Sequence, residues 1–360
     1  MKTSRPFFST LYRSFLLRQQ SAFWNILSGL LLPLSVFYLI INLSKQFFFP
    51  KKRYPFKIIS VGNITTGGTG KTTLVEFIAT KLQEKYARMI IISSGVGSLG
   101  HSPRVAAGWE IRKPKFFGDE VTLLAQSLPR VLFLQGKGKK NLLDLAEANI
   151  KPEVCILDDG MQCYMIRKDK EIALIDALQP LGNRLPIPAG LLRDLPCRLK
   201  KVDAILVTNT FLLSPVKRKK VIALVTRYRK PIFFMNYQVA GIIDPSDRQW
   251  PSELLEGKLV LAFAGIGQPF AFFSLVRELA PRRLYPVAYP DHFDYQSSDI
   301  FELIHLGNKF QVDYWLTTLK DAVKVWQLQP GEKFLAVRII PKITDGKGNP
   351  VSIDTLLKVI

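Results

Sequence analysis

A glycine-rich turn has the composition of a phosphate-binding loop. It reads Asn63-Ile-Thr-Thr-Gly-Gly-Thr-Gly-Lys71-Thr72-Thr73 and lies between an apolar run at 57–62 and a helix-like segment at 74–86. A strand, a glycine turn, Lys-Thr and a helix form the context of a P-loop, whose backbone N–H groups surround a polyphosphate. The alternative is a glycine turn without a ligand. The predicted nucleotide-binding residues are Thr65, Thr66, Gly67, Gly68, Thr69, Gly70, Lys71, Thr72 and Thr73.

Two adjacent carboxylates could complete this site. In P-loop enzymes the lysine reaches the outer phosphates, while the next hydroxyl and an acid from a neighbouring strand hold Mg²⁺. Lys71 and Thr72 occupy the first two positions, and Asp158 and Asp159 follow the apolar run 154–157. Open α/β sheets bind ligands at this end of a strand. A polar turn is the alternative, because Asp and Gly also favour turns.

Apolar runs alternate with helical stretches and predict an α/β fold of the P-loop NTPase type, with a mostly parallel sheet and helices on both faces. A smaller C-terminal α/β lobe is expected to close a catalytic cleft. The expected strands are 57–62, 89–93, 131–134, 154–157, 171–175 and 203–207, then 231–235, 259–264 and 334–340, with a helix at 270–280. The expected parts are an anchoring segment at 1–56, a P-loop domain at 57–212 and the smaller lobe at 213–360.

The first part is basic and apolar. Residues 1–57 contain no acid, and the first carboxylate is Glu76. Phe23–Leu43 carries no charge, and as a helix its 21 residues would be about 30 Å long, close to the thickness of a hydrocarbon core. A membrane-spanning helix and a Pro33-kinked helix or hairpin within one leaflet stay open, beside a buried core helix. A signal peptide is disfavoured because no small-residue cleavage site follows.

The composition excludes some classes of protein and indicates the kind of partner. The formal net charge of +21 over 360 residues implies an anionic partner, while 48% hydrophobic and 22% charged residues exclude disorder and coiled coil. A nucleic-acid binder is not favoured, because much of the positive charge surrounds the apolar segment. The basic runs 137–140 and 198–201 are expected to be solvated or to face a membrane. Cys155, Cys163 and Cys197 predict no disulfide or zinc site and fit a reducing cytosol.

The succession of further motifs resembles the tetraacyldisaccharide 4'-kinase family. Between about residues 55 and 325 the family order is kept. The matching segments after the loop are Gly118-Asp119-Glu120, Asp158-Asp159-Gly-Met-Gln162, Gly182-Asn183, Pro188-Ala-Gly190-Leu-Leu-Arg193-Asp194, Phe263-Ala-Gly265-Ile-Gly267, Pro290-Asp291-His292 and Thr317-Thr-Leu-Lys320-Asp321. The chain departs from the family at Cys163 (usually His), at Leu319 (usually Glu) and at 94–98, where the family has an arginine-rich loop.

The resemblance implies an enzyme that uses ATP and Mg²⁺ to phosphorylate the 4'-hydroxyl of a tetraacyldisaccharide 1-phosphate, the lipid A precursor. It implies work on an anionic membrane surface, at the cytoplasmic face of the bacterial inner membrane, without nucleic acid or an obligate protein partner. The competing class is a partitioning or metal-insertion P-loop ATPase. Those enzymes carry a signature lysine where this chain has Thr66.

The resemblance also assigns roles to residues. It implies Asp119 as the base that accepts the hydroxyl proton, His292 as its partner and Lys71 as a third catalytic residue. The implied metal contacts are Thr72, Glu120, Asp158 and Asp159, and the implied substrate contacts are Gln162, Arg193 and Asp194. By sequence alone, Asp119 could equally be a helix cap. His292 could be a packed or surface histidine, and Arg193 and Asp194 could form a surface ion pair.

Overall fold

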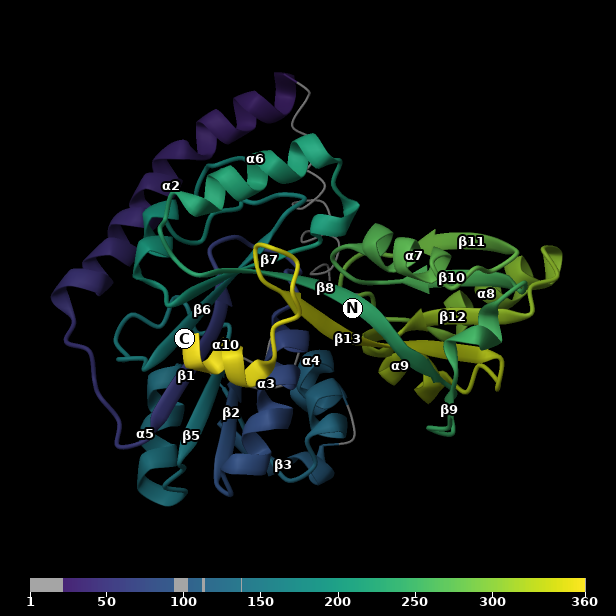
Figure 1. Ribbon diagram of the computed structural model, residues 1–360, viewed down its shortest axis with the longest axis horizontal. Helices are drawn as coiled ribbons and strands as arrows, with labels where there is room; N and C mark the ends of the chain where they lie inside the picture. Colours follow the sequence, from purple (N-terminus) through teal and green to yellow (C-terminus); the bar gives the residue numbers. More distant parts are fainter. Residues whose placement is uncertain (1–21, 94–102, 112–113, 137, 360) are drawn as a thin grey trace.

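One mixed sheet of 13 strands runs through the computed structural model, which describes residues 22–93, 103–111, 114–136 and 138–359 (Figure 1). The strands are β1 (Lys57–Asn63), β2 (Met89–Ser93), β3 (Arg104–Ala107), β4 (Leu132–Gln135), β5 (Val154–Asp158), β6 (Lys170–Asp176), β7 (Ala204–Thr208), β8 (Ile232–Ile243), β9 (Gln249–Trp250), β10 (Leu259–Ala264), β11 (Arg283–Ala288), β12 (Tyr314–Thr318) and β13 (Phe334–Thr344). The described helices are α2 (Ala22–Phe48), α3 (Lys71–Lys85), α4 (Pro114–Ser127), α5 (Lys139–Asn149), α6 (Pro215–Thr226), α7 (Pro269–Arg277), α8 (Ser297–Lys309), α9 (Leu319–Val325) and α10 (Ile353–Val359).

The strand order is β11-β10-β12-β13-β8-β7-β6-β1-β5-β2-β4-β3, with β9 beside β8. The pairs β13–β8, β3–β4 and β8–β9 are antiparallel, and the other neighbours are parallel. This confirms the predicted mostly parallel α/β sheet, and every predicted strand forms.

The sequence missed four strands: β3, β9, β11 and β12. Two of these, β3 and β11, are the edges of the sheet. Neither strand contains a fully buried residue. β11 also includes Pro286; proline has no N–H to donate to a neighbouring strand, and an edge strand tolerates this because it has a neighbour on one side only. Without two buried faces, these strands lack the continuous apolar run on which the prediction relied.

The central strands are buried on both faces. Ile59 and Val61 of β1 pack in one apolar cluster with Leu74 and Ile78 of α3. The intervening Ile58 points to the opposite face, into a second cluster that includes residues of α5. This two-sided burial holds β1, and therefore the loop that follows it, at the centre of the sheet.

Two long strands connect the two ends of the sheet. β8 pairs with β7 through Ile232–Met235 and with β13 from Phe234 to Ile243. In Figure 1, β10–β12 and α7–α9 extend to one side of this pair, away from β1–β7. The middle of each strand is only partly buried, which indicates a thin connection. The predicted boundary at 212/213 precedes α6 and β8, and the domain division stays a prediction.

The N-terminal apolar segment forms one continuous helix, α2, that contains Pro33. The hairpin alternative is therefore wrong. Leu27–Gln46 has a mean hydropathy of 1.9, and only 6% of its most apolar window is buried. The buried core helix is wrong as well, because most of this surface has no protein against it. The cations at Lys2, Arg5, Arg13 and Arg18 lie outside the described residues.

Packing in the C-terminal half predicts the effect of one substitution. A Cβ at Gly307 of α8 would lie 2.3 Å from the Trp315 ring, which stacks on Phe334 and cannot move aside. Alanine would gain about 0.5–1 kcal/mol of helix propensity, but overpacking costs about 1–3 kcal/mol. We expect Gly307→Ala to lower the melting temperature. Gly346→Ala, where no atom lies within 4 Å of the new Cβ, should leave it unchanged; equal melting temperatures would contradict this packing argument.

Candidate functional site

The glycine-rich loop connects β1 to α3, as predicted. The helix begins at Lys71, three residues earlier than expected, because Gly70 in the left-handed conformation (φ 83°) forms its N-cap. A Cβ at Gly70 would also lie 1.9 Å from the Tyr237 hydroxyl of β8. Glycine is therefore required at position 70 for both backbone conformation and space. The loop therefore ends at the N-terminus of α3, the arrangement that phosphate-binding loops use.

Asn63, the last residue of β1, organises the loop and was missed by the sequence prediction. Its Nδ2 donates to Thr69 Oγ1 at 3.2 Å, and its Oδ1 accepts from Lys71 Nζ at 3.3 Å. Gln162 Nε2 donates to the Asn63 carbonyl at 3.0 Å. The signal available in the sequence was a polar residue at the end of an apolar run. The structure shows that this residue is fully buried, where its polar atoms need partners.

Asp159 is clamped by two cations. Arg193 Nη1 lies 2.8 Å from both carboxylate oxygens, and Lys71 Nζ lies 3.8 Å from Oδ1. Burial alone would raise the pKa of Asp159, but the charges of Lys71 and Arg193 outweigh it and lower the pKa to about 2. The carboxylate is therefore ionised at neutral pH. The surface ion pair considered for Arg193 and Asp194 does not form, because Arg193 pairs with Asp159 instead.

The neighbouring Asp158 has the opposite character. It is 3% exposed, and its Oδ1 accepts no hydrogen bond from the described chain. Burial, followed by the negative charge of Glu120, raises the pKa of Asp158 well above its usual range. Lys139 partly offsets this effect and donates to the backbone carbonyls of Asp158 and Asp159, the latter at 2.6 Å. An unpartnered buried carboxylate beside other acids is suited to bind a cation.

The expectation that the basic runs are solvated is wrong for two residues. Lys139 is buried beneath the Asp158-Asp159 turn. Arg198 forms an ion pair with Glu171, and both side chains are at most one-tenth exposed. The basic composition of these runs could not reveal which cation faces a buried acid. Lys137 lies outside the described residues.

A second cluster brings together residues far apart in the sequence. Gly118 (φ 76°) interrupts α4, so that Asp119 begins its second helical segment. Asp119 Oδ2 lies 2.8 Å from Lys324 Nζ and 3.4 Å from His292 Nδ1. Burial raises the pKa of Asp119, but the His292 and Lys324 contacts outweigh burial and lower it to about 2. The predicted pair Asp119–His292 is thus in contact across the two halves of the sheet.

Lysines of α9 complete this second cluster. Lys320 Nζ lies 3.3 Å from His292 Nε2 and 3.6 Å from Glu120 Oε1. Its neighbour Leu319, a departure from the family pattern, is the first residue of α9. The sequence did not predict that Lys320 and Lys324 contact Asp119 and Glu120, because α9 and α4 are far apart in the chain and meet only in the folded structure.

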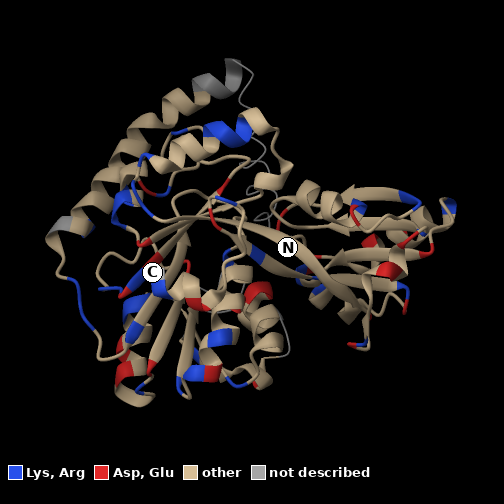
Figure 2. Cartoon of the chain, in the orientation of Figure 1, with Lys and Arg blue, Asp and Glu red and all other residues tan. Residues whose placement is uncertain are grey.

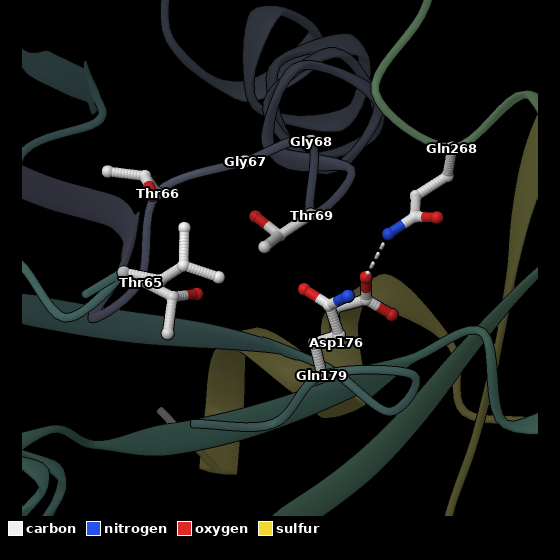
Figure 3. Close-up of a pocket in the computed structure, with 9 residues that line it drawn as sticks. Thr65, Thr66, Gly67, Gly68, Thr69, Asp176, Gln179 and Gln268 are labelled. Atoms are coloured by element: carbon white, nitrogen blue, oxygen red, sulfur yellow. Dashed lines mark hydrogen bonds between the residues drawn. The ribbon is translucent and has the colours of Figure 1, made fainter. Parts of the chain in front are cut away.

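A pocket opens beside the phosphate loop (Figure 3). It is lined by Thr65–Thr69 together with Asp176, Gln179, Leu191 and Gln268. Gln268, from the loop before α7, donates to Asp176 Oδ2 at 2.8 Å. The C-terminal half of the sheet therefore reaches the phosphate loop directly.

Comparison with known proteins identifies the family. The model of the family described as tetraacyldisaccharide-1-P 4'-kinase (LpxK) matches residues 27–357. The chain belongs to this family. It is 31% identical over 330 residues to the tetraacyldisaccharide 4'-kinase of Pelobacter propionicus (89% of this chain, 90% of the relative). It is 34% identical over 273 residues to that of Geobacter metallireducens (74% and 78%).

The solved structure of LpxK from Aquifex aeolicus, in complex with ATP, is similar in fold. It superposes with a TM-score of 0.67 at 25% identity and covers 92% of this chain and 99% of that one. The predicted family is confirmed, and the partitioning or metal-insertion ATPase is not favoured.

Of the other departures from the LpxK pattern, the structure describes the one at Cys163. Cys163 packs against the apolar cluster beneath β5 and follows Gln162, whose amide contacts Asn63. Asp194, which matches the family pattern, is buried and accepts a hydrogen bond from Tyr164 Oη at 2.8 Å. The departure at 94–98 lies outside the described residues.

Proposed function

We propose that this kinase transfers the γ-phosphoryl group of ATP to the 4'-hydroxyl of tetraacyldisaccharide 1-phosphate. One observation carries the proposal: Asp119 contacts His292 and Lys324 of the C-terminal half at 3.4 and 2.8 Å, and the same half reaches the phosphate loop through Gln268. The candidate base therefore lies at the same junction of the two halves as the phosphate loop, whose Lys71 contacts Asp159. The effect of the Glu120 charge on the pKa of Asp158 supports this proximity. A proton acceptor and a phosphate site next to each other are what phosphoryl transfer to a hydroxyl requires.

In this proposal the phosphate loop and Lys71 hold and neutralise the transferred group. Asp119 accepts the proton of the attacking hydroxyl, and His292 orients the carboxylate. With its lowered pKa, Asp119 is ionised at neutral pH but is a weak base. Such a base is sufficient because a loose, metaphosphate-like transition state demands alignment of the hydroxyl more than strong proton abstraction.

We assign Mg²⁺ to Thr72, Glu120, Asp158 and Asp159. The unpartnered Oδ1 of Asp158 and the charge of Glu120 beside it fit a cation. No group of three or more His, Cys, Asp or Glu side chains among the described residues forms a metal cage. This is compatible, since Mg²⁺ takes few protein ligands and completes its shell with phosphate oxygens and water. When bound, the ion would neutralise charge on the phosphates.

We also infer that Gln162, Arg193 and Asp194 contribute to binding of the phosphorylated disaccharide. The support is positional. Arg193 and Gln162 meet at Asn63, and a guanidinium is suited to a phosphate group. Asp194 follows on the same loop, where its contact with Tyr164 stabilises the loop conformation.

We propose that α2 lies in the plane of an anionic membrane. Its outward face is apolar and includes Leu30, Leu34 and Phe37, each more than half exposed. Its inward face is polar: Ser35 is buried and bonds Pro186 O and Ala189 N. A spanning helix would need hydrocarbon on all sides, but here protein occupies one side at the middle of the helix. An in-plane helix satisfies both faces.

A basic helix supports the same orientation. α6 packs through Val221 and Val225 in the apolar cluster that contains Leu192, next to the loop that α2 contacts. Figure 2 shows α6 partly in blue for its Lys and Arg residues. Lys217, Lys219 and Lys220 are exposed and form no ion pair within the described part of the chain. Such cations would meet anionic head groups. Lipid substrate, ATP and unpaired cysteines together favour the cytoplasmic face of the bacterial inner membrane.

The direct test is a transfer assay with tetraacyldisaccharide 1-phosphate and ATP·Mg²⁺ in detergent. We expect phosphorylation at the 4' position by the wild-type chain and at least a tenfold lower kcat, about 1.4 kcal/mol, for Lys71→Ala. Lys81→Ala, an exposed lysine on the same helix, is the matched control and should retain full activity. Folded wild-type protein without transfer would disprove the proposed function.

Asp119 and His292 should act as one unit. A general base contributes about 10²–10⁴-fold, so Asp119→Ala should lose at least about two decades of kcat. Because His292 acts through Asp119, the double variant should be little worse than the poorer single variant. The measurement is a double-mutant cycle on kcat at saturating ATP. Additive losses, or an Asp119→Ala enzyme within tenfold of wild type, would reduce Asp119 to a helix-terminal residue.

Membrane attachment is tested on the outward face of α2. Leu34→Gln/Phe37→Gln should move the protein from the membrane to the soluble fraction while the melting temperature is kept, because neither side chain is buried in the fold. Phe270→Gln/Phe301→Gln removes two exposed aromatic residues from the other half and should leave fractionation unchanged. Equal membrane retention of both variants would contradict the proposed orientation.

A further inference from the structure

The inward face of α2 contacts a residue of the phosphate site. Tyr38 Oη donates to the backbone carbonyl of Arg193 at 3.1 Å, and Asn42 Nδ2 approaches the same oxygen at 3.5 Å. Ser35 holds the start of the same loop at Pro186 and Ala189. Positions 35, 38 and 42 lie on one face of a helix. Ser35, Tyr38 and Asn42 therefore form a polar face of α2 that contacts the 186–193 loop.

From Arg193 the contacts continue to the phosphate loop. Its guanidinium clamps Asp159 and lies 3.4 Å from Asn63 Oδ1, which also accepts from Lys71. Its backbone N–H donates to Ile64 O at 2.7 Å. Arg193 therefore connects α2 both to Asp159 and to Asn63.

The position of Arg193 also affects the catalytic lysine. Asp159 is shared between Arg193 at 2.8 Å and Lys71 at 3.8 Å. If Arg193 moved away, the partly buried carboxylate of Asp159 would lose its closest cation, and Lys71, at 3.8 Å, already contacts it. Lys71 would then be drawn toward Asp159 and away from the phosphates it must reach.

We propose that α2 is a positioning element of the phosphotransfer site, in which Tyr38 and Asn42 hold Arg193 in its close contact with Asp159, so that the longer contact of Lys71 with Asp159 can be exchanged for one with the phosphates. The proposal rests on the proposed function, because it assigns Lys71 to the phosphates of ATP. The membrane helix is then part of the catalytic framework as well as an anchor. Displacements of about 1 Å in such a framework cost on the order of a hundredfold in rate.

The experiment is a kinetic cycle in detergent, where membrane attachment does not limit the reaction. Tyr38→Phe removes one hydroxyl, and we expect it to lower kcat by about 2- to 12-fold, the range for one hydrogen bond. Tyr38→Phe/Asn42→Leu should lower kcat further. Ser44→Ala is the matched control on the same helix, because the Ser44 hydroxyl bonds only Ile41 of α2 itself and should leave kcat unchanged.

The decisive comparison repeats Tyr38→Phe in an Arg193→Ala background. Both α2 contacts are to the backbone carbonyl of Arg193, so that substitution removes the guanidinium and keeps the contacts. If α2 acts through Arg193, Tyr38→Phe should have no further effect on kcat there. A merely structural role would instead lower kcat equally in both backgrounds and lower the melting temperature, and would overturn the proposal.

The remaining outcomes distinguish a failure of the positioning role of α2 from a failure of the proposed function. If Arg193→Ala lowers kcat but Tyr38→Phe and the double α2 variant keep wild-type kcat, the positioning role of α2 is wrong and the proposed function stands. If wild type performs no transfer at all, the proposed function fails first and the positioning role fails with it.

Discussion

Two adjacent carboxylates at the end of β5 impose the central constraint on this molecule. A charge withdrawn from water is costly unless it is paired; Asp158 is buried, and the side chain of its neighbour Asp159 is only 23% exposed. Three elements supply the cations. Lys71 comes from the start of α3, Lys139 from the start of α5 and Arg193 from the loop before β7. The two carboxylates differ in their contacts: both oxygens of Asp159 lie 2.8 Å from Arg193, whereas Oδ1 of Asp158 has no partner among the described residues.

The connection between the two halves has a different character. Within the P-loop half the central strands are buried on both faces, whereas β8 and β13 join the halves through segments that are only partly buried. The contacts between the halves are polar: Asp119 meets His292 and Lys324, and Gln268 meets Asp176. Polar contacts at a thin connection can be exchanged for contacts with water or a ligand at little cost.

The polar and apolar side chains of α2 are distributed in the reverse of the way they are on a surface helix of a soluble protein. Ser35 and Tyr38 bond the rest of the protein, whereas Leu30, Leu34 and Phe37 face outward. Hydrogen bonds rather than apolar packing therefore orient the helix on the 186–193 loop, which leaves the apolar face available to lipid. The same arrangement places the loop that contains Arg193 directly beneath α2.

The sequence by itself determined the elements whose signal is local. Burial on two faces produces apolar runs, so the central strands were predicted nearly to the residue, and the glycine loop was recognisable because its backbone geometry demands glycine at position 70. The family motifs pointed to Asp119 and His292 as a pair. Only the tertiary structure decided partners: that Lys139 is buried beneath the acids, that Asn63 joins the loop to Arg193, and that Tyr38 faces inward. A charge or a hydroxyl has the same local pattern whether it meets solvent or a buried carboxylate, and its partner is set by loops that the fold brings together from distant parts of the chain.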